Sequence, residues 1–254
     1  MNAGQPGVER LVRYRFRGQT GRARLHEDGV LEPLDGPPVR RLDEVELLPP
    51  SEPSKIVGVG LNYHAHAREM GKAVPEEPLL FLKPSTAVIA SGQPIVRPAG
   101  FERVDYEGEL ALVFSRRARH ISEAEAFSVV AGYCCCNDVT VRDLQQRDGQ
   151  YTRAKGFDTF APLGPWLVSG LNPDVLRITT RVDGTVRQQG AVADMIFPLP
   201  RLIATVTRVM TMLPGDVLTT GTPPGVGQAQ VGSVIEVEID GLGVLRNPVV
   251  AEQR

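Results

Sequence analysis

Two glutamates on an apolar segment constrain the fold of this chain more than any other feature. The stretch D-Y-E-G-E-L-A-L-V-F contains Glu107 and Glu109, and the apolar run 110–114 predicts a β-strand. Residues two apart on a strand share a face, with backbones roughly 6.5–7 Å apart. Two acids on one partly buried face repel each other and lose hydration, so they require a positive partner. A divalent cation is the simplest partner, although such pairs are also common on exposed strands.

A third carboxylate follows another apolar segment. Asp138 lies in C-C-C-N-D-V-T-V-R-D, and we expect it to be the third ligand of a cation held by oxygen atoms. The preceding cysteines, residues 134–136, are consecutive, so neighbouring side chains on a strand point to opposite faces and cannot pair readily. No C-x-x-C spacing is present. We interpret the three cysteines as small core residues in a reducing compartment.

Glycine and proline shape the expected architecture. The chain has 26 Gly and 21 Pro among 254 residues, which predicts many turns and few or short helices. Residues 1–50 are expected to form a small N-terminal β-rich domain that ends at Pro49-Pro50, and residues 51–254 the main domain. Periodicity predicts strands and helices in both parts. The predicted strands are 12–16, 23–25, 45–48, 56–60, 79–82, 217–220 and 234–239, and the predicted helices 62–70, 122–125 onward, 139–147 and 198–212. The fold class is therefore α+β and β-rich.

Charge and hydropathy argue against two classes of partner, nucleic acids and membranes. Lys and Arg number 28 against 30 Asp and Glu, so the chain lacks the positive field typical of proteins that bind nucleic acids or acidic membranes. No apolar run approaches the roughly 18 residues needed to span a bilayer, and no signal-peptide core follows Met1. We expect a cytoplasmic location.

Two glycine-rich stretches do not fit nucleotide-binding motifs. Gly58-Val59-Gly60 follows a predicted strand, but Tyr63 occupies the position of the third glycine of a dinucleotide fingerprint. The segment 221–227 (G-T-P-P-G-V-G) lacks the Lys-Ser/Thr of a phosphate-binding loop.

Other polar residues offer chemistry beside a metal. His66 and Glu69, three apart on a predicted helix, share a face, so the carboxylate can orient the imidazole as a general base. Lys155 lies among small and apolar residues, where it would offset nearby acids or bind an anion. Arg142 and Gln145 are one helical turn apart after Asp138. Each of these residues also has an interpretation without a catalytic role. His66 and Glu69 could be a surface pair, Lys155 an exposed loop lysine, and Arg142 a salt-bridge partner of Asp143.

Together these stretches resemble the fumarylacetoacetate hydrolase family from about residue 55 to 249. The matching segments, in order, are G-V-G-L-N-Y-H-A-H-A-R-E-M, L-F-L-K-P, V-D-Y-E-G-E-L-A-L-V, N-D-V-T-V-R-D-L-Q, A-K-G-F-D-T-F-A-P-L-G-P-W, D-M-I-F-P, L-P-G-D-V-L-T-T-G-T-P-P-G-V-G and G-L-G-V-L-R-N-P-V. The small N-terminal part resembles that of the diene-dioate isomerase and decarboxylase branch. The chain departs from the family pattern at residues 191–193 (A-V-A), where relatives usually carry polar residues.

The resemblance implies a fold and a set of roles. The expected fold is a mixed β-sandwich roll, usually in a homodimer. By family position, Glu107, Glu109 and Asp138 bind Mg²⁺ or Mn²⁺. His66 and Glu69 form the catalytic dyad in a segment that often covers the substrate, and Lys155 lies near the metal. The positions that contact the substrate carboxylate or oxo end are Arg142, Gln145 and Thr222.

The implied function is enolate chemistry. Three carboxylates leave about three of six octahedral positions for a 2-oxo acid, and the cation acts as a Lewis acid that stabilises an enolate. We expect isomerisation or decarboxylation of a 2-oxo or 2-hydroxy-dienoic dicarboxylic acid of the hydroxyhepta-diene-dioate type, in the breakdown of aromatic compounds. The alternatives are C–C hydrolysis of an acylpyruvate, decarboxylation of oxaloacetate, or a metal-stabilised scaffold without activity.

Overall fold

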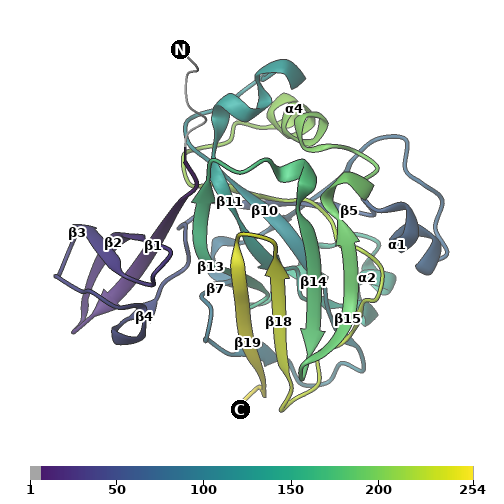
Figure 1. Cartoon of the computed structure of the whole chain (residues 1–254). Coiled ribbons are helices and arrows are strands. Elements are labelled where there is room, and N and C mark those ends of the chain that lie inside the picture. Colours follow the sequence, from purple (N-terminus) through teal and green to yellow (C-terminus); the bar gives the residue numbers. More distant parts are fainter. Residues whose placement is uncertain (1–6, 254) are drawn as a thin grey trace.

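The computed structural model describes residues 7–253, in which strands dominate (Figure 1). Strands hold 43% and helices 19% of the residues, so the β-rich prediction is confirmed. The largest sheet has eleven strands, of which β4 (Glu46–Leu47) pairs with β1 and β7 (Val88–Ile89) pairs with β13. The other nine follow the spatial order β3 (Leu31–Asp35), β2 (Gln19–Leu25), β1 (Glu9–Phe16), β13 (Ala161–Ser169), β11 (Val130–Asn137), β10 (Gly108–Phe114), β16 (Val217–Thr219), β5 (Ile56–Gly60) and β6 (Leu79–Lys83).

A second sheet packs against the middle of the first. Its five strands are, in order, β15 (Thr185–Ala191), β14 (Arg177–Val182), β18 (Val234–Ile239), β19 (Gly243–Ala251) and β8 (Ile95–Arg97). Leu110 and Leu112 of β10 share one buried cluster with Ile178 of β14 and Val237 of β18, so this apolar face forms the core between the sheets. A small third sheet contains β12 (Thr140–Val141), β9 (Val104–Tyr106) and β17 (Gly227–Gln228).

The helices are short. They are α1 (His64–Glu69), α2 (Arg142–Asp148), α3 (Thr152–Lys155) and α4 (Leu199–Val209), together with the 3-10 turns Leu42–Glu44, Ser85–Ala87, Glu123–Val129, Pro173–Val175 and Val192–Asp194. α4 buries the apolar face that its periodicity predicts against the core. None of the helices within residues 7–253 is long and apolar enough to cross a membrane.

Two predicted helices differ from the structure. The helix expected over 139–147 begins only at Arg142, because the β-branched pair Thr140–Val141 pairs with β9 instead. The segment after Ser122 is the 3-10 turn Glu123–Val129 rather than an α-helix, although Ser122 and Glu125 form the expected capping box.

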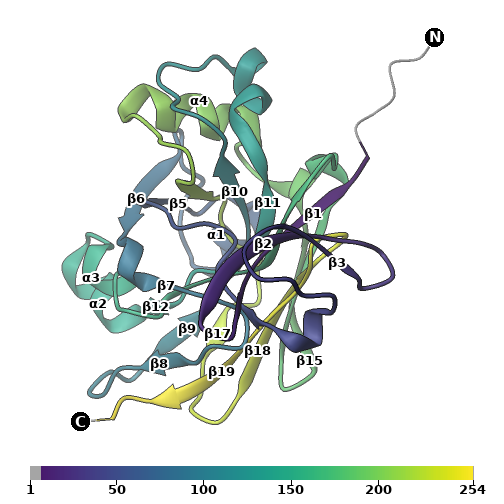
Figure 2. The ribbon, with the colours of Figure 1, turned by 90° about the vertical axis from the view of Figure 1, so that its left-hand side faces the viewer.

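The N-terminal strands extend the large sheet (Figure 2). β1 pairs antiparallel with β13, with Glu9 opposite Ser169, and the strands β1 to β3 also bury a small apolar cluster of their own around Tyr14. The division of the chain at residue 50 stays a prediction.

The three cysteines are buried core residues without disulfides, as predicted. They lie on β11, where Cys135 faces the core between the two large sheets and Cys134 and Cys136 face the cluster on the other side. Burial raises the pKa of all three thiols, which makes them poor nucleophiles.

A buried carboxylate fastens β16 to β5. Asp216 is fully buried and accepts hydrogen bonds from the Ser54 hydroxyl (2.6 Å), the Ser54 N–H (3.0 Å) and the Leu213 N–H (2.8 Å). Its other partners are the N–H and the ammonium group of Lys55. Although burial disfavours its charge, the hydrogen bonds from Lys55 and Ser54 lower the pKa of Asp216.

We expect Asp216→Asn to lower the free energy of unfolding at pH 7 by about 1.5–3 kcal/mol, the usual contribution of hydrogen bonds to a charged group. Because the pKa of Asp216 is depressed in the folded state, this contribution is present above the ordinary unfolded value near 3.9 and is lost as the pH falls through the folded value. Urea denaturation at pH 7 and pH 3 measures the difference. Asp43→Asn, at an exposed aspartate, is the control. An equal loss of unfolding free energy in Asp216→Asn at both pH values would contradict a stabilising role for the Asp216 charge.

Candidate active site

The sheet brings the three predicted acidic ligands together. Glu107 directly precedes β10, Glu109 lies on it, and Asp138 directly follows the antiparallel neighbour β11. Gly108 lies opposite Asn137 and the Asp138 N–H donates to the Glu107 carbonyl (2.8 Å), so the start of one strand meets the end of the other. One carboxylate oxygen from each acid lies within 4.8 Å of the others, and all three acids are buried.

Gly108, between the two glutamates, is required by packing. A Cβ at this position would lie 2.0 Å from Thr180 Oγ1 of β14, so only glycine allows the two sheets to approach here. The E-G-E motif therefore places both carboxylates on one face while its middle residue contacts the opposite sheet.

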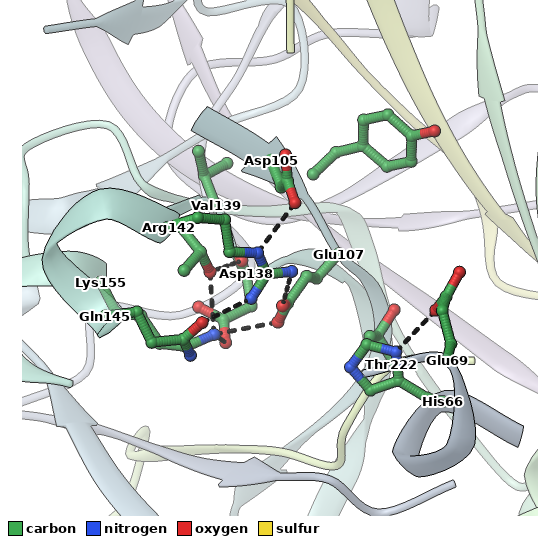
Figure 3. Close-up of polar contacts among 12 residues, drawn as sticks. His66, Glu69, Asp105, Glu107, Asp138, Val139, Arg142, Gln145, Lys155 and Thr222 are labelled. Carbon is green, nitrogen blue, oxygen red and sulfur yellow. Dashed lines mark hydrogen bonds and ion pairs between the residues drawn. The ribbon is translucent and has the colours of Figure 1, made fainter. Parts of the chain in front are cut away.

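Three buried cations contact Glu107 and Asp138, and Figure 3 shows two of them, Arg142 and Lys155. Arg142 Nη2 donates to Glu107 Oε1 (2.5 Å), and Lys155 Nζ donates to Glu107 Oε2 (2.9 Å) and to Asp138. Lys83, at the end of β6, donates to the other oxygen of Asp138. Lys83 was not among the predicted site residues, although a lysine that ends the apolar run L-L-F-L is a signal that could have identified it.

Glu109 is the acid without a cationic partner. Among residues 7–253 it accepts one hydrogen bond, from the Gly221 N–H (2.9 Å), and makes no ion pair. Burial, together with the charges of Asp138 and Glu107, raises the pKa of Glu109 well above its usual value. The pKa of Glu107 is lowered, because Lys155 and Arg142 outweigh its burial. Gly221 has φ +92°, and a Cβ added at this position would lie 2.7 Å from Asn62 Cβ. Glycine is therefore needed where the backbone N–H donates to Glu109.

This donor set fits a hard divalent cation. Carboxylate oxygens are the protein ligands that Mg²⁺ and Mn²⁺ prefer, and three converge here from two adjacent strands. Within residues 7–253 Glu109 has no cationic partner, so a bound cation would supply the positive charge that this carboxylate lacks. The assignment of Glu107, Glu109 and Asp138 as ligands stays a prediction.

His66 and Glu69 form the expected pair on α1. His66 Nδ1 lies 3.0 Å from Glu69 Oε2, and Glu69 Oε1 accepts the Gly225 N–H (2.9 Å). The carboxylate is an acceptor, so the Nδ1–H tautomer satisfies this contact and leaves Nε2 of the buried imidazole with a free lone pair.

One pocket joins most of the predicted residues. Its lining includes His66, Glu107, Glu109, Arg142, Gln145, Lys155 and Thr222. Asp138 is joined to this group through Lys155, and Glu69 through His66. The apolar departure at residues 191–193 is not part of the lining, and Val192 packs into the main core instead.

Two further buried residues position this group. Asp105 accepts a hydrogen bond from Arg142 Nε (2.8 Å), and its alternation with Glu107 and Glu109 could have revealed it. Gln188 accepts the Gly108 N–H (2.9 Å) and donates to Thr222 Oγ1 and to the Pro223 carbonyl (2.8 Å each), which fixes the Thr222 loop to the acidic strand. No local sequence pattern marks Gln188, because its partners are distant along the chain.

Comparison with known proteins identifies the family of this chain. Residues 55–250 match the model of the family described as fumarylacetoacetate (FAA) hydrolase, C-terminal. The structure is similar to 5-carboxymethyl-2-hydroxymuconate delta-isomerase from Mycobacterium smegmatis (42% identity, TM-score 0.90), covering 96% of this chain and 100% of that one. It is also similar to 2-hydroxyhepta-2,4-diene-1,7-dioate isomerase from Mycobacterium marinum (38% identity, TM-score 0.87, coverage 97% and 100%).

A third similar structure contains a metal. Fumarylpyruvate hydrolase from Pseudomonas aeruginosa, in complex with Mn²⁺ and pyruvate, is 34% identical with a TM-score of 0.75, covering 82% of this chain and 92% of that one. The family match spans most of the chain, and the similar proteins are named as isomerases and hydrolases. The chain belongs to the fumarylacetoacetate hydrolase family and is an enzyme of the isomerase or C–C hydrolase type.

Proposed function

We propose that this enzyme is a Mg²⁺-dependent isomerase or decarboxylase of a 2-oxo or 2-hydroxy-dienoic dicarboxylic acid formed in the breakdown of aromatic compounds. The observation that carries the proposal is the placement of three buried carboxylates and a buried, carboxylate-oriented histidine around one pocket. The similarity to two isomerases of such acids, over nearly the whole chain, supports this class of substrate.

Some residues of the pocket bind the substrate, and others transfer a proton. Glu107, Glu109 and Asp138 would hold a divalent cation, Mg²⁺ or Mn²⁺, which would supply Lewis-acid stabilisation of negative charge on the oxygen of a 2-oxo acid. Gln145 and Arg142, whose guanidinium group is already fixed by Asp105, bind the carboxylate beside that oxygen.

His66 moves the proton. Its Nε2 accepts a proton from the enol hydroxyl of a 2-hydroxy-dienoic acid, or from the carbon next to the keto group of a 2-oxo acid. It returns a proton at another carbon of the conjugated chain, which is isomerisation. Glu69 is a positioning residue, because it holds the imidazole in the required tautomer and stabilises the imidazolium ion. The ammonium group of Lys155 holds Glu107 and Asp138 in place.

The second candidate is C–C hydrolysis of an acylpyruvate. The similarity to fumarylpyruvate hydrolase favours it, and decarboxylation of oxaloacetate would use the same pocket. In these reactions His66 would activate water or protonate the carbon released by bond cleavage.

A substrate panel tests the proposal. Purified protein is assayed with 2-hydroxyhepta-2,4-diene-1,7-dioate, acetylpyruvate, fumarylpyruvate and oxaloacetate, before and after chelation and with Mg²⁺ or Mn²⁺ restored. We expect loss of the conjugated-diene absorbance of the first substrate, abolished by chelation and restored by Mg²⁺. Faster turnover of the acylpyruvates would favour the second candidate, and no turnover of any 2-oxo acid would refute both.

A further inference from the structure

We propose that Lys72 binds the second carboxylate of a dicarboxylic substrate and thereby selects such substrates over 2-oxo acids with an uncharged tail. This inference rests on the proposed function, because it assigns the far end of the same substrate. Lys72 lines the pocket together with His66, Glu107 and Glu109.

The charges of the buried cluster leave room for only one substrate carboxylate. The buried acids are Asp105, Glu107, Glu109 and Asp138, and the buried cations are Lys83, Arg142 and Lys155. The cluster therefore carries one excess negative charge, which a divalent cation converts to one excess positive charge. One substrate carboxylate balances this excess, so a second carboxylate requires another cation. Arg103 also contacts Asp105, but its side chain is 49% exposed and it does not line the pocket.

Lys72 is the available cation. Three lysine or arginine residues line the pocket, and two of them, Arg142 and Lys155, are held in buried ion pairs. Within the described part of the chain, the ammonium group of Lys72 makes neither a hydrogen bond nor an ion pair, and the residue is exposed. It can therefore turn toward a ligand without breaking an existing contact.

The apolar part of the pocket lining suits a hydrocarbon chain between two charged ends. Leu61, Met70 and Tyr151 line the same pocket as Lys72 and His66. An unsaturated dicarboxylic acid has charged ends and an apolar middle, and burying the middle against these side chains is favourable.

The backbone holds Lys72 in a fixed place relative to His66. α1 ends in a Schellman motif, in which the Lys72 N–H donates to the Ala67 carbonyl (2.9 Å) and the Gly71 N–H to the Arg68 carbonyl (3.0 Å). Gly71 has φ +64°, the left-handed conformation that this motif needs. The helix that carries His66 thus also fixes the backbone of Lys72, so only the Lys72 side chain has to move to reach the second carboxylate.

Paired ligands test this assignment by binding rather than by turnover. Mg²⁺-loaded wild type, Lys72→Met, Lys72→Arg and Arg68→Met are titrated calorimetrically with 2-oxoheptanedioate and with 2-oxoheptanoate, which lacks the second carboxylate. Arg68 is the matched control, an exposed basic residue on α1 that does not line the pocket. All three substitutions replace exposed side chains, so folding is expected to be preserved.

We expect Lys72→Met to lower the affinity for 2-oxoheptanedioate about tenfold, the effect of one partly exposed charge-assisted hydrogen bond. Its affinity for 2-oxoheptanoate should stay within twofold of the wild-type value. Lys72→Arg should keep most of the wild-type affinity for 2-oxoheptanedioate. In turnover, KM for the dicarboxylic substrate should rise while kcat is preserved. Equal effects on both ligands, no effect on either, or the same effect from Arg68→Met would overturn the assignment. If wild type binds neither acid with Mg²⁺, the proposed function fails. If wild type binds both equally well, that function stands and the Lys72 assignment fails.

Discussion

Replacing Glu109 with glutamine is expected to lower the affinity for Mg²⁺ by at least about 100-fold, more than is usual for loss of an outer partner of a metal ligand. It is also expected to stabilise the metal-free protein by about 1–3 kcal/mol. The substitution weakens metal binding but stabilises the metal-free protein, because Glu109 is buried beside Glu107 and Asp138 without a cationic partner. Glutamine keeps an acceptor for the Gly221 N–H, whereas it removes the charge that only a cation would balance.

Two measurements at pH 8 check the Glu109 prediction. Calorimetry gives the Mg²⁺ affinity, and thermal unfolding with and without Mg²⁺ gives the stability. Wild type should melt higher with Mg²⁺, whereas Glu109→Gln should melt at one temperature in both conditions. Glu123→Gln, at a half-exposed glutamate, is the control. Retained tight binding in Glu109→Gln would mean that the cation lies elsewhere.

Replacing His66 with alanine is expected to lower kcat by about 10²–10⁴-fold, the usual contribution of a general base. The metal ligands and Arg142 remain in place, so the affinities for Mg²⁺ and for oxalate should be unchanged. His64 provides the matched control, since it lies on the same helix, is exposed and does not line the pocket.

Steady-state kinetics on the best substrate of the panel, combined with oxalate titration, checks the His66 prediction. His64→Ala should keep wild-type kcat. Unchanged kcat in His66→Ala would remove the His66–Glu69 pair from the mechanism, and equal loss in the two variants would point to the helix rather than the imidazole.

Local patterns in the sequence predicted fewer than half of the nineteen strands between residues 7 and 253, but they did predict the acidic cluster. The run 110–114 and the E-x-E spacing depend only on strand geometry, so Glu107 and Glu109 could be placed on one face before any fold was known. The boundary at Arg142 was missed because pairing of Thr140–Val141 with β9 is a tertiary contact that local propensity does not contain. The homodimer implied by the resemblance stays a prediction.

The cations around the acids were harder to predict. Lys83 meets Asp138, 55 positions later, because the order β10-β16-β5-β6 places the end of β6 near the acidic cluster. Gln188 reaches Gly108 across 80 positions through the packing of the second sheet on the first. Such contacts follow from sheet order and sheet packing, which no short window of sequence specifies.

Anomalous diffraction from crystals grown with Mn²⁺ and oxalate tests whether Glu107, Glu109 and Asp138 hold the cation. We expect one strong anomalous peak bonded to oxygens of all three acids, at about 2.0–2.3 Å, with oxalate on the open side facing His66. A map with no peak there, and the three carboxylates turned onto Arg142, Lys155 and Lys83 alone, would contradict this assignment.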